Sequence, residues 1–223
     1  MIKLINGTKK YKGSTYEVAA VDDVTLDIES GEFVAVMGKS GSGKSTLLNI
    51  LGCMDTLDTG ELYIDDIEVS KLSKNEFDKV RRNKVSYIFQ RYELMSNYTV
   101  YENIELPLNV KRIKRNAKKA MIMDIMKKLD IEDLRDKFPN QISGGEQQRV
   151  AIARAYVSQN EYILADEPTG ALDEKNTAII MELLKKLNGE GKTIIMVTHD
   201  ENVASYATRV IKLVDGKVQG QEG

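Results

Sequence analysis

The sequence predicts an α/β fold built on a mainly parallel sheet, with an antiparallel β subdomain and an inserted helical subdomain. The first observation is a set of short apolar runs, separated by longer helical patterns, at residues 33–37, 85–89, 162–165 and 193–197. Residues that are apolar at successive positions are typical of strands buried on both faces of a parallel sheet. Because such strands alternate with helices along the chain, we expect an α/β architecture.

The second observation is the pattern of the first thirty residues, where isolated apolar side chains stand among polar ones. They are Leu4, Val18, Val21, Val24, Leu26 and Ile28. This spacing is typical of half-exposed antiparallel strands. Near the other end of the chain, Asp215-Gly216 lies between the apolar stretch 210–214 and residues 217–218. Because Asp-Gly favours a two-residue turn, we expect a closing β-hairpin there.

The third observation is the loss of strand signals between residues 91 and 159. Inside this stretch, residues 116–129 place apolar side chains at helical spacing, at Ile122, Ile125, Met126 and Leu129. We therefore predict one domain over residues 1–223, with the core and β subdomain at 1–90 and 160–219 and a helical subdomain at about 91–159. A basic cluster opens the helical subdomain: Lys111, Arg112, Lys114, Arg115, Lys118 and Lys119. We interpret it as a solvated helix face; contact with lipid headgroups or with an acidic loop of a partner is the alternative.

Composition narrows the class of protein. A chain of 223 residues is long enough for one sizeable domain with a buried core. The formal net charge of -2 gives no overall attraction to nucleic acid or anionic lipid. The single cysteine, Cys53, cannot form an internal disulfide, which suits a reducing cytosol. No apolar run approaches the roughly 20 residues of a membrane helix, so we expect any membrane role to act from the cytosolic side through another chain.

A phosphate-binding loop is the strongest motif. Residues 38–45 fit the pattern G-x-x-x-x-G-K-[ST], and they follow an apolar strand and precede a helical run. The glycines let backbone N–H groups turn toward phosphate oxygens. Lys44 then supplies positive charge to the β- and γ-phosphates, and Ser45 offers a hydroxyl ligand to Mg²⁺ beside the helix N-terminus. The residues expected around the phosphates are Gly38, Lys39, Ser40, Gly41, Ser42, Gly43, Lys44, Ser45 and Thr46.

Two acids end the apolar strand at residues 162–165. Asp166 at the carboxyl end of that strand would lie beside the phosphate loop, where it can hold Mg²⁺ directly or through water. Glu167 is one residue further along and can polarise the water that attacks the γ-phosphate. An acid pair after a strand is ordinarily a loop start or a helix cap. Beside a phosphate loop, the catalytic interpretation is the better one.

A second glycine pair opens the helix predicted at residues 148–157. Ser143 and Glu146 have the spacing of a capping box, which leaves Gly144 and Gly145 unexplained because glycine costs about 1 kcal/mol in a helix. Glycines at a helix N-terminus suit close approach of an anion to backbone N–H groups. We therefore expect a second phosphate binder, formed by Ser143, Gly144, Gly145, Glu146 and Gln147. Head-to-tail pairing of two chains would bring both binders to one nucleotide.

The motifs, in this order, resemble those of the ATP-binding-cassette (ABC) ATPases over nearly the whole chain. Residues 38–45 resemble the Walker A motif, 142–148 the signature motif, and 162–167 the Walker B motif with its catalytic glutamate. Four further positions match other family motifs: Gln90 the Q-loop glutamine, 171–173 the D-loop, His199 the switch histidine, and Tyr11 the aromatic residue that stacks on adenine, with Tyr16 as a nearby competitor.

The resemblance implies a P-loop NTPase core of the ABC type and an enzyme that hydrolyses ATP with Mg²⁺. It implies catalytic roles for Glu167, His199, Gln90 and Lys44, and Mg²⁺ ligands at Ser45, Gln90 and Asp166. It also implies a homodimer with two ATP molecules between the chains. The expected partner is an integral-membrane permease, not nucleic acid, and the expected location is the cytoplasmic face of a prokaryotic cell membrane.

The finer resemblance is to the lipoprotein-release and macrolide-export branch, the LolD/MacB type, which also includes exporters of antimicrobial peptides. It rests on residues 38–52, 102–108 and 168–173, and it implies a separate permease. The alternative is a membrane-associated regulatory ATPase of the cell-division type that moves no cargo. A non-transport ATPase of DNA repair or ribosomes would need coiled coils or two cassettes. The chain departs from the family pattern at Lys39, at Ile142 and in the charged segment 91–93, which normally faces the permease.

Overall fold

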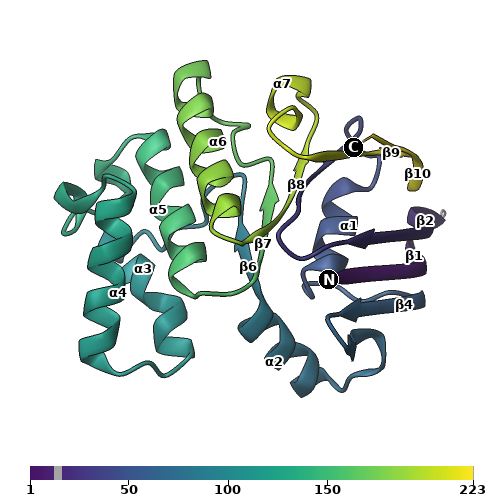
Figure 1. Ribbon diagram of the computed structural model, residues 1–223, viewed down its shortest axis with the longest axis horizontal. Coiled ribbons are helices and arrows are strands. Elements are labelled where there is room, and N and C mark those ends of the chain that lie inside the picture. The colour runs from purple at the N-terminus through teal and green to yellow at the C-terminus, as the bar shows by residue number, and fades with distance from the viewer. Residues whose placement is uncertain (13–16, 223) are drawn as a thin grey trace.

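The computed structural model describes residues 1–12 and 17–222 and shows two β-sheets with helices packed around them (Figure 1). The strands are β1 (Ile2–Lys12), β2 (Glu17–Ile28), β3 (Phe33–Met37), β4 (Thr59–Ile64), β5 (Ile67–Glu68), β6 (Val85–Ile88), β7 (Tyr162–Asp166), β8 (Thr193–Thr198), β9 (Arg209–Val214) and β10 (Lys217–Glu222). The α-helices are α1 (Lys44–Leu51), α2 (Lys74–Lys84), α3 (Val100–Val110), α4 (Arg115–Lys128), α5 (Gly144–Val157), α6 (Glu174–Gly189) and α7 (Glu201–Ala204). Short 3-10 turns occupy Val69–Lys71, Glu132–Leu134 and Pro139–Gln141.

The central sheet has the strand order β10-β9-β3-β8-β7-β6. Its inner strands pair in parallel, and β9 and β10 form the antiparallel hairpin expected at Asp215-Gly216. The four apolar runs are β3, β6, β7 and β8, as predicted. In β3, Phe33 and Ala35 face one hydrophobic core while Val34 and Val36 face the other. This two-sided burial is why the strands are apolar at successive positions.

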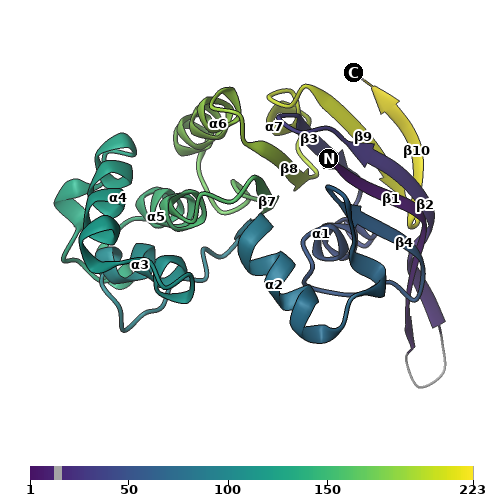
Figure 2. The same ribbon diagram turned by 60° about the horizontal axis from the view of Figure 1, so that its bottom comes forward.

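The antiparallel β subdomain is the second sheet, with the order β2-β1-β4-β5. Its pairs are antiparallel, and Leu4 and Leu26 lie opposite each other and are fully or almost fully buried. One face of this sheet packs on the apolar side of α1, so α1 lies between the two sheets (Figure 2). The predicted half-exposed strands at the start of the chain are therefore confirmed.

The stretch between residues 91 and 159, all of it described, contains helices and no strand. Helices α3, α4 and α5 gather on the far side of β6 from α1 (Figure 1). Helix α4 matches the predicted helix to within one residue at each end. Helix α5 begins at Gly144, not at Gln148 as expected, because Ser143 caps it and the glycines form its first turn.

The basic cluster at the start of this stretch is only partly a solvated face. Lys111 donates to the carbonyl oxygen of Ser158 at 2.7 Å, and Lys118 forms an ion pair with Glu105 at 2.8 Å. The other four basic residues are exposed, as expected. Lys111 therefore fastens the end of α3 to the chain between α5 and β7, a contact that charge patterning alone did not predict.

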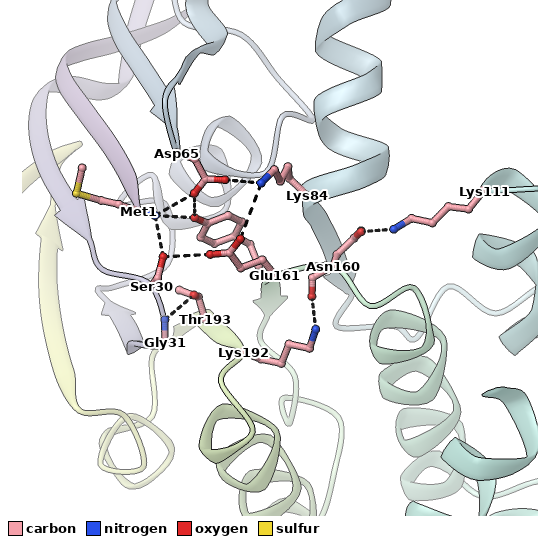
Figure 3. A network of polar contacts seen from close by, with 11 residues as sticks. Met1, Ser30, Gly31, Asp65, Lys84, Lys111, Asn160, Glu161, Lys192 and Thr193 are labelled. Carbon is pink, nitrogen blue, oxygen red and sulfur yellow. Dashed lines mark hydrogen bonds and ion pairs between the residues drawn. The ribbon is translucent and has the colours of Figure 1, made fainter. Parts of the chain in front are cut away.

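A polar network connects the two sheets at the amino ends of β7 and β8 (Figure 3). Asp65, in the β4–β5 turn, accepts hydrogen bonds from the amino group of Met1, from Lys84 at the end of α2 and from Tyr162 at the start of β7. Asn160 accepts from Lys111 and, through its carbonyl oxygen, from Lys192. The network thus fixes the amino ends of β7 and β8. The candidate site lies at the opposite, carboxyl ends of these strands.

No helix within the described part of the chain has both the length and the apolar character needed to cross a membrane.

Candidate active site

A cavity of about 1290 Å³ opens at the carboxyl ends of β3, β7 and β8. In a parallel sheet this edge is where ligands bind, because the loops that follow neighbouring strands converge there. The cavity is lined by Tyr11, Ala20, Met37, Gly38, Lys39, Ser40, Gly41, Ser42, Gly43, Lys44, Ser45, Thr46, Gln90, Asp166, Glu167, His199, Lys212, Leu213, Val214 and Asp215. The structure thus brings together every sequence-predicted site residue except the second glycine motif.

The phosphate loop forms one wall of the cavity. Gly43 has φ of 99°, and a Cβ at this position would stand 1.9 Å from the carbonyl oxygen of Ala20, so only glycine fits. Lys44 is buried and its ammonium group donates to the carbonyl oxygens of Gly38 and Lys39 at 2.7 and 3.0 Å. The lysine therefore lies across the loop, with its charge where phosphate oxygens would enter.

A pair of oxygen donors suits a magnesium ion. Ser45, at the start of α1, donates to Asp166 Oδ1 at 3.1 Å, and Asp166 is the last residue of β7. Burial raises the pKa of Asp166 above its ordinary value. A hydroxyl and a carboxylate so close together fit a hard cation, which would neutralise the charge of the half-buried carboxylate.

The catalytic candidates Glu167 and His199 touch each other. Glu167 Oε1 lies 2.8 Å from His199 Nδ1, and the Glu167 side chain is 15% exposed. Glu167 has φ of 45°, unusual for a residue other than glycine, and its backbone N–H donates to the carbonyl oxygen of Val197 on β8. Two neighbouring strands thus hold this carboxylate over the cavity, where it can accept a proton from water.

Gln90 and Tyr11 also line the cavity. Gln90 follows β6, and its amide nitrogen lies 3.0 Å from the place where a Cβ on Gly170 would stand, so it packs against the loop after Glu167. Tyr11 is 45% exposed, and its hydroxyl donates to Asp55 Oδ2 at 2.8 Å. Tyr16, its competitor, lies outside the described residues. Asp55 was missed by sequence reasoning, because nothing in its local pattern marks it.

The second glycine motif lies away from this cavity. The capping box is confirmed: Ser143 Oγ accepts from the backbone N–H of Glu146, and the Glu146 carboxylate accepts from the backbone N–H of Ser143. The glycines also have a steric reason within the chain. A Cβ on Gly144 would stand 2.9 Å from the hydroxyl oxygen of Tyr92, and one on Gly145 would stand 2.4 Å from Asn176 Oδ1. Contacts within the chain are therefore a reason for these glycines that neither the capping box nor the sequence pattern shows.

Known proteins are similar to this chain in sequence and in fold. The sequence model of the ABC transporter family matches residues 21–170. The uncharacterized ABC transporter ATP-binding protein MJ0796 of Methanocaldococcus jannaschii is 48% identical over 227 residues, covering 100% of this chain and 97% of that protein. The macrolide export ATP-binding/permease protein MacB of Campylobacter jejuni is 47% identical over 207 residues, covering 91% of this chain and 32% of that protein.

Solved structures of similar proteins have the same fold. A dimeric structure of the MJ0796 cassette in a post-hydrolysis state, bound to ADP and phosphate, superimposes with a TM-score of 0.92 at 47% identity and covers 100% of this chain and 98% of that one. The cbiO1 structure from Clostridium perfringens gives a TM-score of 0.88 at 27% identity, covering 99% of this chain and 87% of that one. With the phosphate loop and the acidic pair at the edge of a parallel sheet, the chain belongs to the ABC transporter family, as an ATP-binding subunit that hydrolyses ATP.

Proposed function

We propose that this chain powers an integral-membrane permease of the macrolide-export or lipoprotein-release type, working as a homodimer that encloses two ATP molecules. The observation that carries the catalytic part is the contact of Glu167 with His199 above the phosphate loop. The transport part is supported by the macrolide-export relatives, whose names combine an ATP-binding and a permease function. The chain spans about a third of the length of those relatives. Through the permease, the protein would act at the cytoplasmic face of the cell membrane.

Each cavity residue has a role in this proposal. The backbone of residues 38–46 and the Lys44 ammonium group bind the phosphates, and the exposed ring of Tyr11 stacks on adenine. Ser45, Asp166 and Gln90 would hold Mg²⁺, which supplies positive charge to the phosphate oxygens when bound. Glu167 orients and deprotonates the attacking water, and His199 holds Glu167 and donates to the γ-phosphate. The protein thus mainly positions groups and stabilises charge.

Dimerisation follows from the separation of the two phosphate binders. Gly38–Ser45 lines the cavity, whereas none of the described residues of the Ser143–Gln147 motif does. The N-terminus of α5, with 14 residues of aligned peptide dipoles, presents backbone N–H groups that suit an anion. A second chain, placed head to tail, would bring this end of α5 to the nucleotide of the first. The dimeric structures of MJ0796 support the formation of a dimer.

The permease would dock in a groove between the core and the helical subdomain at residues 91–159. This groove has a volume of about 540 Å³ and lies between α2 and β6 on one side and α3 and α5 on the other. Its lining includes Arg81, Arg82, Tyr87, Pro107, Lys111 and Arg154. Movement of the helical subdomain during ATP binding and hydrolysis would change the shape of the groove and so do work on the permease.

Purification from the native membrane tests the proposal. The purified chain should hydrolyse ATP in a Mg²⁺-dependent manner, and it should co-purify with a multi-spanning membrane protein whose cargo stimulates hydrolysis. Hydrolysis without such a protein, or without stimulation by any cargo, would favour the regulatory alternative. Loss of hydrolysis in a Glu167→Gln variant ties the activity to this site.

A further inference from the structure

The segment that follows Gln90 holds two consecutive residues in an unusual backbone conformation. Tyr92 has φ of 61° and Glu93 has φ of 48°, and neither is glycine. Left-handed conformations at residues with a side chain persist only where surrounding contacts hold them. This segment is also where the chain departs from the family pattern, because it is more charged and polar than expected.

Arg154 supplies the contact that holds this conformation. Its Nη1 donates to the carbonyl oxygen of Glu93 at 2.6 Å, and its Nη2 donates to the carbonyl oxygen of Tyr92 at 2.8 Å. The guanidinium fork therefore bonds both left-handed residues at once, which the single ammonium group of a lysine cannot reproduce in the same geometry. Partial burial lowers the pKa of Arg154, and the bonds to two carbonyl oxygens satisfy part of the hydrogen-bonding capacity of this half-buried cation.

Arg154 lies on α5, and this helix makes two more contacts with the loops that carry Gln90 and Glu167. Tyr92 reaches from the Gln90 segment to the N-terminus of α5, where a Cβ on Gly144 would stand 2.9 Å from its hydroxyl oxygen. Gln148, fully buried on α5, donates to the carbonyl oxygen of Pro168 at 2.5 Å, and Pro168 directly follows Glu167. Helix α5 thus contacts the backbone next to both Gln90 and Glu167.

We propose that Arg154 is a positioning residue for ATP hydrolysis: it locks the backbone at Tyr92 and Glu93 and thereby fixes Gln90 in the cavity relative to α5. The inference rests on the proposed role of Gln90. Gln90 is two residues from Tyr92, so a change in the backbone there moves its side chain. Because the N-terminus of α5 carries the second phosphate motif, the lock makes the position of Gln90 depend on the position of that motif.

The test compares Arg154→Met with Arg154→Lys and with Arg115→Lys, an exposed arginine at the start of α4, as matched control. Arg154→Met should lower kcat about tenfold to a hundredfold, as expected for a small displacement of a catalytic group. The KM for ATP should stay within about twofold, because the phosphate loop is untouched. Arg154→Lys should fall between wild type and Arg154→Met, and Arg115→Lys should match wild type.

A second substitution separates positioning from packing. Asparagine adopts the left-handed conformation more readily than glutamate, so Glu93→Asn should restore much of the kcat of Arg154→Met. Arg154→Met with wild-type kcat would overturn the inference, as would a lost kcat that follows a lowered Tm and is not restored by Glu93→Asn. If the wild-type protein hydrolysed no ATP, the proposed function would fail; if the wild type and Arg154→Met were equally active, only this inference would fail.

Discussion

Tyr11 is held at the nucleotide cavity by a residue from a distant loop. Asp55, beyond the end of α1, accepts from the Tyr11 hydroxyl and from the Lys9 ammonium group, each at 2.8 Å. Partial burial opposes ionisation of Asp55, but the hydrogen bonds from Lys9 and Tyr11 prevail and lower its pKa, so the carboxylate is charged at neutral pH. Because the Tyr11 hydroxyl is bonded to Asp55, the proposed contact with the adenine base would use the ring of Tyr11.

Asp55→Ala should therefore weaken ATP binding without slowing hydrolysis. The freed Tyr11 ring would lose its orientation, and a hydrogen bond to a charged group is worth about 1.5–3 kcal/mol at most. Only part of this free energy would be lost from ATP binding, because the bond orients the ring and does not itself contact the nucleotide. We therefore expect the KM for ATP to rise about threefold to tenfold with kcat unchanged. Steady-state kinetics measures both, and Asp124→Ala, which removes an exposed acid on α4, is the control. An equal fall in kcat would place Asp55 in the chemistry instead.

A site residue can be predicted from the sequence when it belongs to a motif or follows directly after a strand of the parallel sheet. Lys44, Ser45, Asp166 and Glu167 follow from a motif and from the meeting of parallel strands at one edge. The sequence predicts neither the direct contact between Glu167 and His199 nor the left-handed backbone at Glu167. Asp55 could not be predicted, because its importance comes only from the approach of β1 to the loop after α1.

At the scale of a helix, the start of α5 could not be predicted fully, because it depends on residues that are distant in the sequence. A capping box can be seen in four letters of sequence, but the side chains within 3 Å of a Cβ on Gly144 or Gly145 belong to Tyr92 and Asn176, far away in the chain. The sequence therefore predicts a helix that begins at Gln148, whereas α5 begins at Gly144. Strand positions were predicted well, because burial on two faces leaves a pattern in the sequence itself.

Gly145→Ala separates the steric reason for this glycine from phosphate binding. The added methyl would stand 2.4 Å from Asn176 Oδ1, and overpacking of this kind costs about 1–3 kcal/mol, partly offset by the roughly 1 kcal/mol gain of alanine in a helix. We expect urea unfolding to show net destabilisation, which Asn176→Ala should relieve in the double variant. If ATPase activity stays low in the stable double variant, the glycine is needed for the nucleotide; if activity returns, it is not.

The polar network at Asp65 makes stability depend on pH. Partial burial works to raise the pKa of Asp65, but the bonds from Lys84, Tyr162 and the Met1 amino group lower it to about 2. A lowered pKa means that the stabilisation is complete above the unfolded value of about 3.9 and is lost as the pH falls through the folded value.

Asp65→Asn should reduce the free energy of unfolding at neutral pH by about 2 kcal/mol, since each unit of pKa shift is worth about 1.4 kcal/mol. The difference from wild type should shrink as the pH falls from about 4 toward 2. Urea titrations across this range measure it. Lys84→Met should show the same pH dependence, whereas Lys74→Met, exposed at the start of α2, should not. If the difference in free energy of unfolding between wild type and Asp65→Asn did not vary with pH, the stabilisation would not come from the charge of Asp65.

On the scale of the whole molecule, the two predicted phosphate binders lie apart within one chain. One phosphate binder lines the cavity at the carboxyl edge of the central sheet, and the other caps α5 in the helical subdomain. Sequence reasoning predicted both motifs and their order along the chain. Their separation in space depends on how the helical subdomain packs beyond β6, which only the structure shows.

Glu167→Gln should trap the closed dimer. The amide keeps the size of the carboxylate but cannot accept a proton from water, so hydrolysis should fall by about 10²–10⁴-fold while ATP still binds. ATP would then bridge the phosphate loop of one chain and the Ser143–Gln147 motif of the other without being consumed. Light scattering should show a mass of about twice 25.0 kDa with ATP and a monomer with ADP. Ser143→Lys in the same background, which places a bulky side chain at the second binder, should remain monomeric with ATP. If Glu167→Gln itself stayed monomeric at saturating ATP, the dimer that encloses two ATP molecules would be wrong, even with the hydrolytic site intact.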